Sequence, residues 1–538
     1  MKRTIIALKI NFIVATMKQT TDRYYIQLAW AWIGAFTLFR IVYAGQFLLV
    51  PDETNYWQWS RHLAWGYHDQ APLIAWCIAL ATALLGHTEI AVRLPSILSM
   101  AVVSAYLVLI ARRWIGPRAA WHTALLTQGI LLFNVGGLLA TADGLQAAGW
   151  AGATYHVARA YEKGAWRQWI AGGLWFGFGL LGKYTMVLFL PGAFLYGLLA
   201  SRHRPRLAGL RPYIGVLAGL AMFTPVIGWN AQNNWNSVRH VAYIGGANEA
   251  FALHLRFFGD YLASQAALLS PLVFILVLMA WGRGLGRRNF KDHWIYAYLT
   301  CSSLPMFAGF AVLSLHARVY GNWPGAAYLA PMVLIPAFFT PLSPAAVPSS
   351  KPSVGTRLWP WAVGSAYLFS ALVLLQVVWP LLPLPSAMDR TATEIQGWDQ
   401  LGRKAADLRA TMPDPQRTFL FGLRYQTASE LAFYTPGQPA TVSINKWKRP
   451  NVYDYWWQDK DLIGWDAVGV TYESDHHTTR LNQIFDHVDP PVKLEITRKS
   501  VWQPGSDELI KTFYLYRAYG FKGGLRWEPK DKKDIRAR

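Results

Sequence analysis

The stretch Pro51-Asp52-Glu53-Thr54-Asn55-Tyr56-Trp57-Gln58-Trp59-Ser60 directly follows a hydrophobic run and places two adjacent carboxylates at its edge. Unpaired acids next to hydrocarbon are costly and are usually retained for function. In a chain that crosses a bilayer, these acids would face solvent at the membrane surface. The stretch therefore marks the end of a first membrane span and the first candidate for a functional site.

The composition of the whole chain indicates a membrane protein. Of 538 residues, 53% are hydrophobic and 15% are charged, whereas soluble domains carry about 25% charged residues. The net charge of +21 comes from short basic clusters between apolar runs, a pattern typical of cytoplasmic loops. Nucleic-acid binding would need a continuous basic face, so no nucleic-acid partner is expected. Cys77 and Cys301 lie in apolar surroundings and predict no disulfide framework.

Eleven apolar runs approach the length that crosses a bilayer. They fall near 27–49, 92–111, 119–140, 144–160, 168–183, 185–200, 212–229, 264–282, 294–314, 325–342 and 358–380. A Lys/Arg cluster follows each even-numbered run, so all the clusters share one side of the membrane. Basic loops stay in the cytoplasm, which places the N-terminus inside and the C-terminal region outside. The clusters are Arg112, Arg113 and Arg118, then Arg159, Lys163 and Arg167, then Arg202, Arg204, Arg206 and Arg211, then Arg283, Arg287, Arg288 and Lys291, then Lys351 and Arg357.

The segments around these runs predict the domain organisation. Residues 1–26 are expected to form a cytoplasmic, partly amphipathic leader, and residues 27–383 an all-α polytopic membrane domain. Within it, residues 51–91 form one long outer loop. The apolar run 72–86 in this loop is too short for a span and is expected to form a juxtamembrane helix. The stretch 341–353, rich in Pro, Ser and Ala, is typical of a linker.

After Pro383 the composition becomes that of a soluble domain. Residues 384–538 are expected to form a small α/β domain on the outer face of the membrane. The expected strands are 419–421, 467–470 and 512–516, and the expected helices are 393–412 and 425–434.

Several motifs together resemble one family. They are Asp52-Glu53, Tyr56-Trp57, Trp59-Ser60, Trp65-Gly66-Tyr67, Asp69, Pro72-Leu73, Arg93-Leu94-Pro95, Thr141-Ala142-Asp143, Gly182-Lys183-Tyr184-Thr185, Asn322-Trp323-Pro324-Gly325 and Arg424-Tyr425-Gln426. In this combination the chain resembles bacterial glycosyltransferases of the protein-mannosyltransferase-like (GT-C) superfamily, which includes aminoarabinose–lipid A transferases and rhizobial galacturonosyltransferases. The resemblance implies the GT-C fold and a place in the bacterial inner membrane. It also implies transfer of a sugar from a polyprenyl phosphate carrier to a lipid, glycan or protein on the periplasmic side.

Sugar transfer to a hydroxyl group needs a general base beside the acceptor and positive charge beside the departing phosphate. Asp52 is the expected base of a single displacement that inverts configuration, and the resemblance implies the same role. The alternative for Asp52 is a helix N-cap. Glu53 is expected either to orient a substrate or to hold the loop.

Two further acids belong to the predicted site. The resemblance implies a second functional acid at Asp143, which opens the run 144–160 on the outer face; its alternative is helix capping. Asp69 stands where the resemblance places an acid that can bind a metal, so a divalent cation remains an open choice of cofactor. The alternative for Asp69 is a turn residue before Pro72. Gln70 follows it, where the aminoarabinose enzymes have a lysine.

Cations and aromatic residues complete the predicted site. Lys183, beside Tyr184 at the outer end of the run 168–183, is expected to bind the lipid phosphate. Its alternative is a snorkelling lysine that reaches the membrane interface. Arg318 is a second phosphate candidate or an ordinary loop charge. Arg61 and Arg93 are weaker candidates that would otherwise pair with nearby acids, and Tyr67 belongs to loop aromatics that suit a sugar face.

A transporter of lipid-linked sugars is the rival function. Transporters place their coupling residues near the middle of the bilayer, on broken helices and often within inverted repeats. Here the acids gather at the outer edge and no repeat is apparent in the sequence. The pattern therefore favours the transferase, without indicating which sugar or which acceptor it uses.

Overall fold

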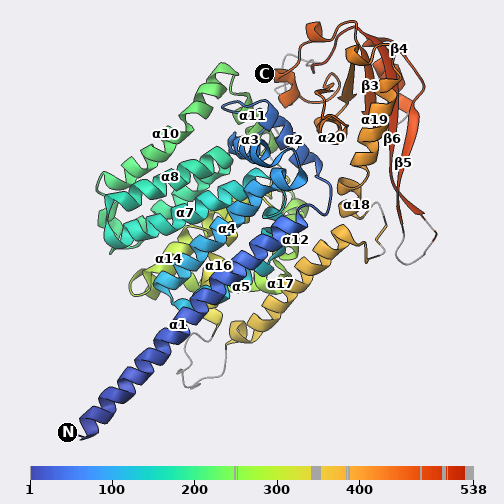
Figure 1. Cartoon of the computed structure of the whole chain (residues 1–538). Helices are drawn as coiled ribbons and strands as arrows, with labels where there is room; N and C mark the ends of the chain where they lie inside the picture. The colour runs from blue at the N-terminus through green and yellow to red at the C-terminus, as the bar shows by residue number, and fades with distance from the viewer. Residues whose placement is uncertain are drawn as a thin grey trace.

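The computed structural model consists of a helical bundle followed by a small sheet domain (Figure 1). It describes residues 2–247, 250, 252–340, 353–382, 384–385, 388–472, 475–499, 505 and 507–527. The linker predicted at 341–353 lies outside the described residues except for Ser353. The chain starts with one continuous helix, α1 (Lys2–Tyr43), which also contains the predicted leader.

The rest of the bundle consists of α-helices and short 3-10 helices. In chain order they are α2 (Pro51–Arg61), α3 (Leu73–Leu85), α4 (Glu89–Trp114), α5 (Pro117–Gly129), α6 (Leu131–Gly136), α7 (Ala142–Lys163), α8 (Trp166–Gly182), η1 (Tyr184–Leu188), α9 (Phe189–Leu199), η2 (Arg204–Arg206), α10 (Arg211–Gln232), α11 (Asn236–Ile244), α12 (Leu255–Leu269), α13 (Pro271–Gly284), η3 (Arg287–Phe290), α14 (Trp294–Cys301), α15 (Leu304–Leu313), η4 (Gly325–Tyr328), α16 (Pro331–Phe339) and α17 (Val354–Val378).

The bundle confirms a multi-pass membrane protein, but the predicted number of eleven spans is not confirmed. Among the described residues, 5 helices are long and apolar enough to cross a bilayer, or 6 if α12 and α13 count as one span bent by 105°. Other predicted spans are broken into shorter helices. At Ser270, for example, a positive φ of 71° followed by Pro271 ends α12 and starts α13. Apolar runs in the sequence cannot show such breaks.

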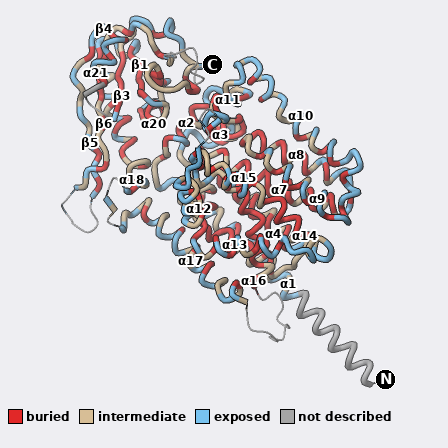
Figure 2. Tube along the Cα trace, turned by 180° about the vertical axis from the view of Figure 1, so that it is seen from behind, coloured by how far each residue is buried: buried red, intermediate tan, exposed pale blue. Residues whose placement is uncertain are grey.

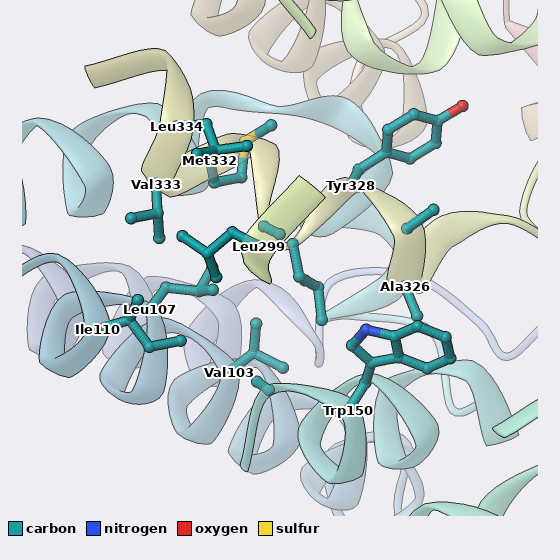
Figure 3. Close-up of a cluster of buried hydrophobic side chains, with 14 of the residues drawn as sticks. Val103, Leu107, Ile110, Trp150, Leu299, Ala326, Tyr328, Met332, Val333 and Leu334 are labelled. Atoms are coloured by element: carbon teal, nitrogen blue, oxygen red, sulfur yellow. The ribbon is translucent and has the colours of Figure 1, made fainter. Parts of the chain in front are cut away.

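Buried apolar side chains from separate helices hold the bundle together (Figure 3). Leu107 of α4, Trp150 of α7, Leu299 of α14 and Met332 of α16 are all at most 1% exposed. Inside a bilayer, hydrocarbon tails are as apolar as these side chains, so close packing rather than escape from water favours their contact.

Glycines allow α8 to approach its neighbours closely. A Cβ atom added to Gly173 or Gly177 would collide with the backbone of Gly215 or Gly219 on α10. Small residues at such contacts let helix backbones touch. The glycines of α8 therefore let this helix pack closely against α10.

The basic clusters and the candidate acids lie at opposite ends of the bundle. Arg113 pairs with Glu162 at 2.6 Å, and Arg211 donates to the carbonyl of Gly164 at 2.6 Å, so the first three clusters meet. Asp143 stands in the first turn of α7 and Lys163 in its last turn. The 22 residues of this helix span about 33 Å, roughly the thickness of a bilayer core.

The C-terminal domain contains one six-stranded sheet and confirms the predicted small α/β domain. The strands follow the order β2-β1-β3-β6-β4, and β5 also pairs with β6. Pairs β1–β2 and β1–β3 are parallel, whereas β6 runs antiparallel to β3, β4 and β5. The strands are β1 (Thr418–Gly422), β2 (Thr441–Ser443), β3 (Asp466–Thr471), β4 (Phe485–Val488), β5 (Val492–Lys499) and β6 (Asp507–Phe521).

Helices around the sheet fit the prediction with one exception. The predicted helix 393–412 is split, because Gly397 adopts a left-handed φ of 83° between α18 and α19. The predicted helix 425–434 is present as α20. The helices of this domain are α18 (Arg390–Ile395), α19 (Trp398–Ala410), η5 (Pro415–Arg417), α20 (Tyr425–Tyr434), η6 (Val452–Tyr455), η7 (Asp459–Asp461) and α21 (Asp475–Leu481).

The outer loop joins the two parts of the molecule. Helices α2 and α3 lie at the end of the bundle that faces the sheet domain, next to α20 (Figures 1 and 2). The side-chain amide of Gln58 on α2 donates to Thr441 Oγ1 at 3.2 Å and to Tyr453 Oη at 3.1 Å. The loop predicted to carry the acids is therefore packed between bundle and domain.

Candidate active site

Helix α2 presents one face to a large cavity. Pro51 occupies its first turn, where a missing N–H costs nothing. Asp52, Asn55, Tyr56 and Trp59 follow at the spacing that puts side chains on one side of a helix, and all four line a cavity of about 1190 Å³. Asp52 is thus part of the cavity wall.

The cavity is amphipathic and lies between the bundle and the C-terminal domain. Its charged lining gathers Asp52, Asp69, Lys183, His240, Arg390, Glu394 and Arg449. Its apolar lining includes Leu138, Leu139, Phe310, Leu313, Val373 and Leu374. Such a lining suits a ligand with a charged headgroup and a hydrocarbon chain.

The Asp52 carboxylate opens to the cavity and has no hydrogen-bond or ion-pair partner among the described residues. Val50 is the N-cap of α2, and Asp52 follows in the first turn, so the capping alternative has no cap hydrogen bond to support it. Asp52 is exposed and lines the cavity. The surrounding protein, and then the charges of Glu394 and Asp69, raise the pKa of Asp52 to about 6.

Glu53 points the other way and is fully buried in an ion pair. Arg93 donates from Nη2 to Glu53 Oε2 at 2.7 Å and from Nε to Oε1 at 2.9 Å, with both side chains 0% exposed. The backbone N–H groups of Val50 and Ala140 also donate to this carboxylate. Of the two roles predicted for Glu53, these contacts serve the one of holding the loop. The predicted pairing of Arg93 with a nearby acid is confirmed.

Asp69 lies in a cluster of histidine and arginine side chains. His240 Nε2 is 3.0 Å from Asp69 Oδ1, and Arg449 Nη1 is 3.5 Å from the same oxygen. The ring of His68 lies 4.9 Å from that of His240. Burial acts to raise the pKa of Asp69, but the hydrogen bond from His240 and the nearby positive charges outweigh it and hold the pKa below its ordinary value.

This cluster has a donor set that fits a divalent metal. Ligand atoms of His68, Asp69 and His240 all lie within 4.8 Å of one another. Two imidazoles and one carboxylate are a frequent ligand set for Zn²⁺. Burial lowers the pKa of His68 to about 4, which keeps its ring in the neutral form that binds metals.

Lys183 and Asp143 form an ion pair next to the cavity. Lys183 Nζ donates to Asp143 Oδ1 at 2.7 Å, and the amide of Asn322 donates to Oδ2 at 3.3 Å. Lys183 and Asn322 line the cavity. Tyr184 lines it too, and its hydroxyl is hydrogen-bonded to that of Ser237 at 2.7 Å. The structure therefore brings these predicted site residues together.

Three other predicted site residues do not line the cavity. Arg318 is exposed in the loop after α15. Arg61 lies over the ring of Trp57 at 4.8 Å and donates to the carbonyl of Pro439. Tyr67 is buried, stacked on Trp59 at 4.4 Å, and its hydroxyl accepts from the N–H of Ala64. The contacts of Arg61 and Tyr67 hold the outer loop in place.

The sequence did not single out several residues of the cavity. They are His240, Glu394 and Arg449, and His68 beside them belongs to the histidine cluster. The adjacent pair His68-Asp69 was a usable signal, since two metal-binding side chain types stand next to each other. His240 and Arg449 carry no local signal, because only folding brings them to Asp69.

Comparisons with known proteins show which family and which fold the chain resembles. The family model described as dolichyl-phosphate-mannose-protein mannosyltransferase matches residues 69–229. Lipid A galacturonosyltransferase RgtD of Rhizobium johnstonii is 27% identical over 311 residues, which cover 56% of this chain and 63% of that protein. The chain therefore matches somewhat less than two thirds of the length of this relative.

Solved structures show the same fold. The crystal structure of ArnT from Cupriavidus metallidurans in the apo state gives a TM-score of 0.56 at 15% identity, covering 93% of this chain and 98% of that chain. The crystal structure of the same ArnT bound to undecaprenyl phosphate gives a TM-score of 0.60 at 15% identity. This match covers 90% of this chain and 97% of that chain. The resemblance predicted from the motifs is thus confirmed: the chain has the GT-C fold and is a relative of the protein-mannosyltransferase-like glycosyltransferases.

Proposed function

We propose that the protein is a membrane glycosyltransferase that moves a sugar from a polyprenyl phosphate carrier to an acceptor hydroxyl. One observation supports this proposal above the others. Asp52 has a carboxylate that lines a partly charged and partly apolar cavity and finds no partner in the part of the chain that the structure describes. A base beside a site for an amphipathic donor is what this reaction requires.

The relatives supply the substrate classes of the proposal. The ArnT crystal structure contains undecaprenyl phosphate, and RgtD is named for galacturonosyl transfer to lipid A. We therefore place a polyprenyl-phosphate-linked sugar in the cavity as donor. Among a lipid, a glycan and a protein, a lipid of the lipid A type is the first acceptor to test.

The proposed reaction is a single displacement at the anomeric carbon. Asp52 takes the proton of the acceptor hydroxyl, whose oxygen forms the new bond to the sugar as the bond to the phosphate oxygen breaks. The electron pair of that bond leaves with the lipid phosphate, and the configuration inverts. Lys183, held by Asp143, supplies positive charge to the leaving group. Holding both substrates in one cavity supplies part of the rate gain.

A divalent metal would be held by His68, Asp69 and His240, the donor set that fits it. It would add positive charge beside the departing phosphate. Transfer measured before and after chelation, with Zn²⁺ added back, tests this part of the proposal. Restoration by Zn²⁺ supports a metal, and full activity in the chelator removes it.

The proposed topology follows from the two ends of the bundle. The basic clusters lie on the cytoplasmic side of the inner membrane, together with the leader 1–26, and the cavity opens on the periplasmic side. The membrane domain is then 27–383, with 51–91 as its first periplasmic loop, and 384–538 form a periplasmic domain. Cysteine labelling from outside intact cells at position 403 on α19 would test this orientation.

A proteoliposome assay separates the transferase from the rival transporter of lipid-linked sugars. The purified protein receives a polyprenyl phosphate donor carrying labelled sugar and lipid A as acceptor. The proposal expects label on the acceptor, whereas movement of intact donor across the bilayer without transfer would favour the transporter. Mass spectrometry of lipids and glycans from a deletion strain then identifies the sugar and the acceptor.

A further inference from the structure

The C-terminal domain contributes a cation to the cavity. In the part of the chain that the structure describes, three Lys or Arg side chains line this cavity: Lys183, Arg390 and Arg449. The first comes from the bundle, and the other two come from the C-terminal domain. Their engagement with carboxylates differs, which decides how much of each charge remains for a ligand.

Lys183 and Arg390 are each committed to one carboxylate. Lys183 is 10% exposed and lies 2.7 Å from Asp143. Arg390 is 85% exposed and lies 3.1 Å from Glu394, four residues later on α18. An exposed pair such as Arg390–Glu394 stays in contact with solvent and contributes little energy.

Arg449 is both held in place and open. Its side chain is 39% exposed and lies 3.5 Å from Asp69, too long for a strong ion pair. Nη1 lies 3.2 Å from Nε2 of His240, and the guanidinium lies over the ring of Tyr425 at 5.8 Å. These contacts orient a planar group with five N–H donors in a residue that lines the cavity.

The loop that carries Arg449 is fixed by buried amides. The Asn451 side chain donates to Asn445 Oδ1 at 2.7 Å, and Asn445 donates to Asp454 Oδ1 at 2.9 Å. The backbone N–H of Asn445 donates to the carbonyl of Leu525 at 2.7 Å. Both asparagines are at most 3% exposed. A loop held this way presents Arg449 at a defined position instead of a mobile surface charge.

We propose that Arg449 binds the phosphate of the polyprenyl carrier, so that the C-terminal domain completes the active site. Guanidinium groups bind phosphate oxygens through paired hydrogen bonds, and a donor beside Asp52 would place its phosphate within reach of such a group. The inference rests on the proposed function and adds a residue and a domain to it. Arg449 then shares the charge of the leaving phosphate with Lys183.

Binding of two lipids that differ only in the phosphate tests this proposal. Undecaprenyl phosphate and undecaprenol are titrated against the detergent-solubilised full chain by native mass spectrometry. For Arg449→Gln we expect Kd for undecaprenyl phosphate to rise about tenfold or more, since a charge-assisted contact is lost, with binding of undecaprenol unchanged. Arg449→Lys keeps the charge but not the fork and should fall between Arg449→Gln and the unaltered protein. Arg403→Gln, which removes an exposed arginine paired with Asp399 on α19, should bind both lipids normally.

The other outcomes separate failure of this inference from failure of the proposed function. Equal weakening of both lipids by Arg449→Gln would mean that the arginine only docks the domain, and unchanged binding of undecaprenyl phosphate would remove it from the site. Either result overturns the inference and leaves the transferase intact. If the unaltered protein does not prefer undecaprenyl phosphate to undecaprenol, the proposed function itself fails. Thermal unfolding of each variant shows whether a loss reflects misfolding.

Discussion

Asp52 and Glu53 are neighbours in the sequence and carry the same functional group, yet they belong to two different regions of the molecule. Glu53 is 0% exposed and bonded to Arg93 and to backbone N–H groups in the packed region behind α2. Asp52 faces the cavity without a partner among the described residues. Successive residues of a helix point about 100° apart. The helical phase of α2, and not residue type, therefore separates the carboxylate proposed as the base from the one that holds the fold.

Replacing Asp52 should have the largest effect and tests whether Asp52 and Glu53 have different roles. Asp52→Asn keeps the shape of the side chain but cannot accept the acceptor proton. Transfer should fall roughly 10²- to 10⁴-fold, the usual contribution of a general base, while the melting temperature stays unchanged. The measurement is initial-rate transfer in proteoliposomes together with thermal unfolding in detergent. Near-normal turnover by this variant would exclude Asp52 as the base.

The same change one residue later should have the opposite pattern. Glu53→Gln leaves the Arg93 charge buried without its carboxylate, which costs about 3 to 5 kcal/mol in folding stability. We expect little folded protein and a sharply lowered melting temperature. Any protein that does fold should retain most of its specific activity. A stable but inactive Glu53→Gln variant would instead assign Glu53 to the chemistry.

The sequence predicted where the site lies better than it predicted which residues form it. Acids at the edge of an apolar run, and basic clusters at regular intervals, were enough to place Asp52, Asp143 and Lys183 at one end of a bundle. Strands β1 and β3, part of β6, and the helix 425–434 also followed from local patterns, whereas β2, β4 and β5 did not. The number of spans is not confirmed, because breaks such as Ser270-Pro271 cannot be read from apolar runs.

Residues that converge from distant parts of the chain could not be predicted. Arg449 contacts His240 across 209 positions and Asp69 across 380 positions. Neither Arg449 nor His240 belongs to a motif, and each resembles an ordinary loop or helix side chain in isolation. For Glu53 the sequence left two roles open, because the start of α2 decides which of the two adjacent carboxylates faces the cavity.

The pH dependence of transfer provides a second test of Asp52, the carboxylate that faces the cavity. Burial and neighbouring carboxylates raise the pKa of Asp52 to about 6. The base must be ionised, so the rate should be constant above this value and fall about tenfold per pH unit below it. Rates at saturating acceptor between pH 4.5 and 8.5 measure the profile. A plateau that continues to pH 4.5 would mean that another group takes the proton.

A neighbouring carboxylate offers a matched control for that profile. The charge of Glu394 raises the pKa of Asp52, so Glu394→Gln should move the acid limb to lower pH without abolishing transfer. Glu495 on β5 is exposed, pairs with Lys493 and does not line the cavity. Glu495→Gln should leave the profile where it is. A shift caused by both variants would indicate a general change in protein charge.

Glu430 provides the smallest test, on the packed side of α2. It is 0% exposed in α20, and burial, opposed by the charge of Lys511, raises its pKa well above the ordinary value. The unfolded chain releases this proton near pH 4.3, whereas the folded protein keeps it. Folding stability supplied by the bound proton is therefore complete at low pH and declines as pH rises above about 4.3.

Glutamine cannot ionise, so Glu430→Gln should remove this decline. At pH 8 we expect the variant to be more stable than the unaltered protein by on the order of 1 kcal/mol, and at pH 4 about equally stable. Thermal unfolding at the two pH values measures the difference, with Glu495→Gln as the exposed control. If the variant is less stable at pH 8, the charged form of Glu430 is needed in the fold. The interactions lost with that charge would then outweigh the free energy gained by no longer burying it. In that case a second charged carboxylate would lie on the packed side of α2. The carboxylates on the two sides would then differ in whether they have partners, and not in burial.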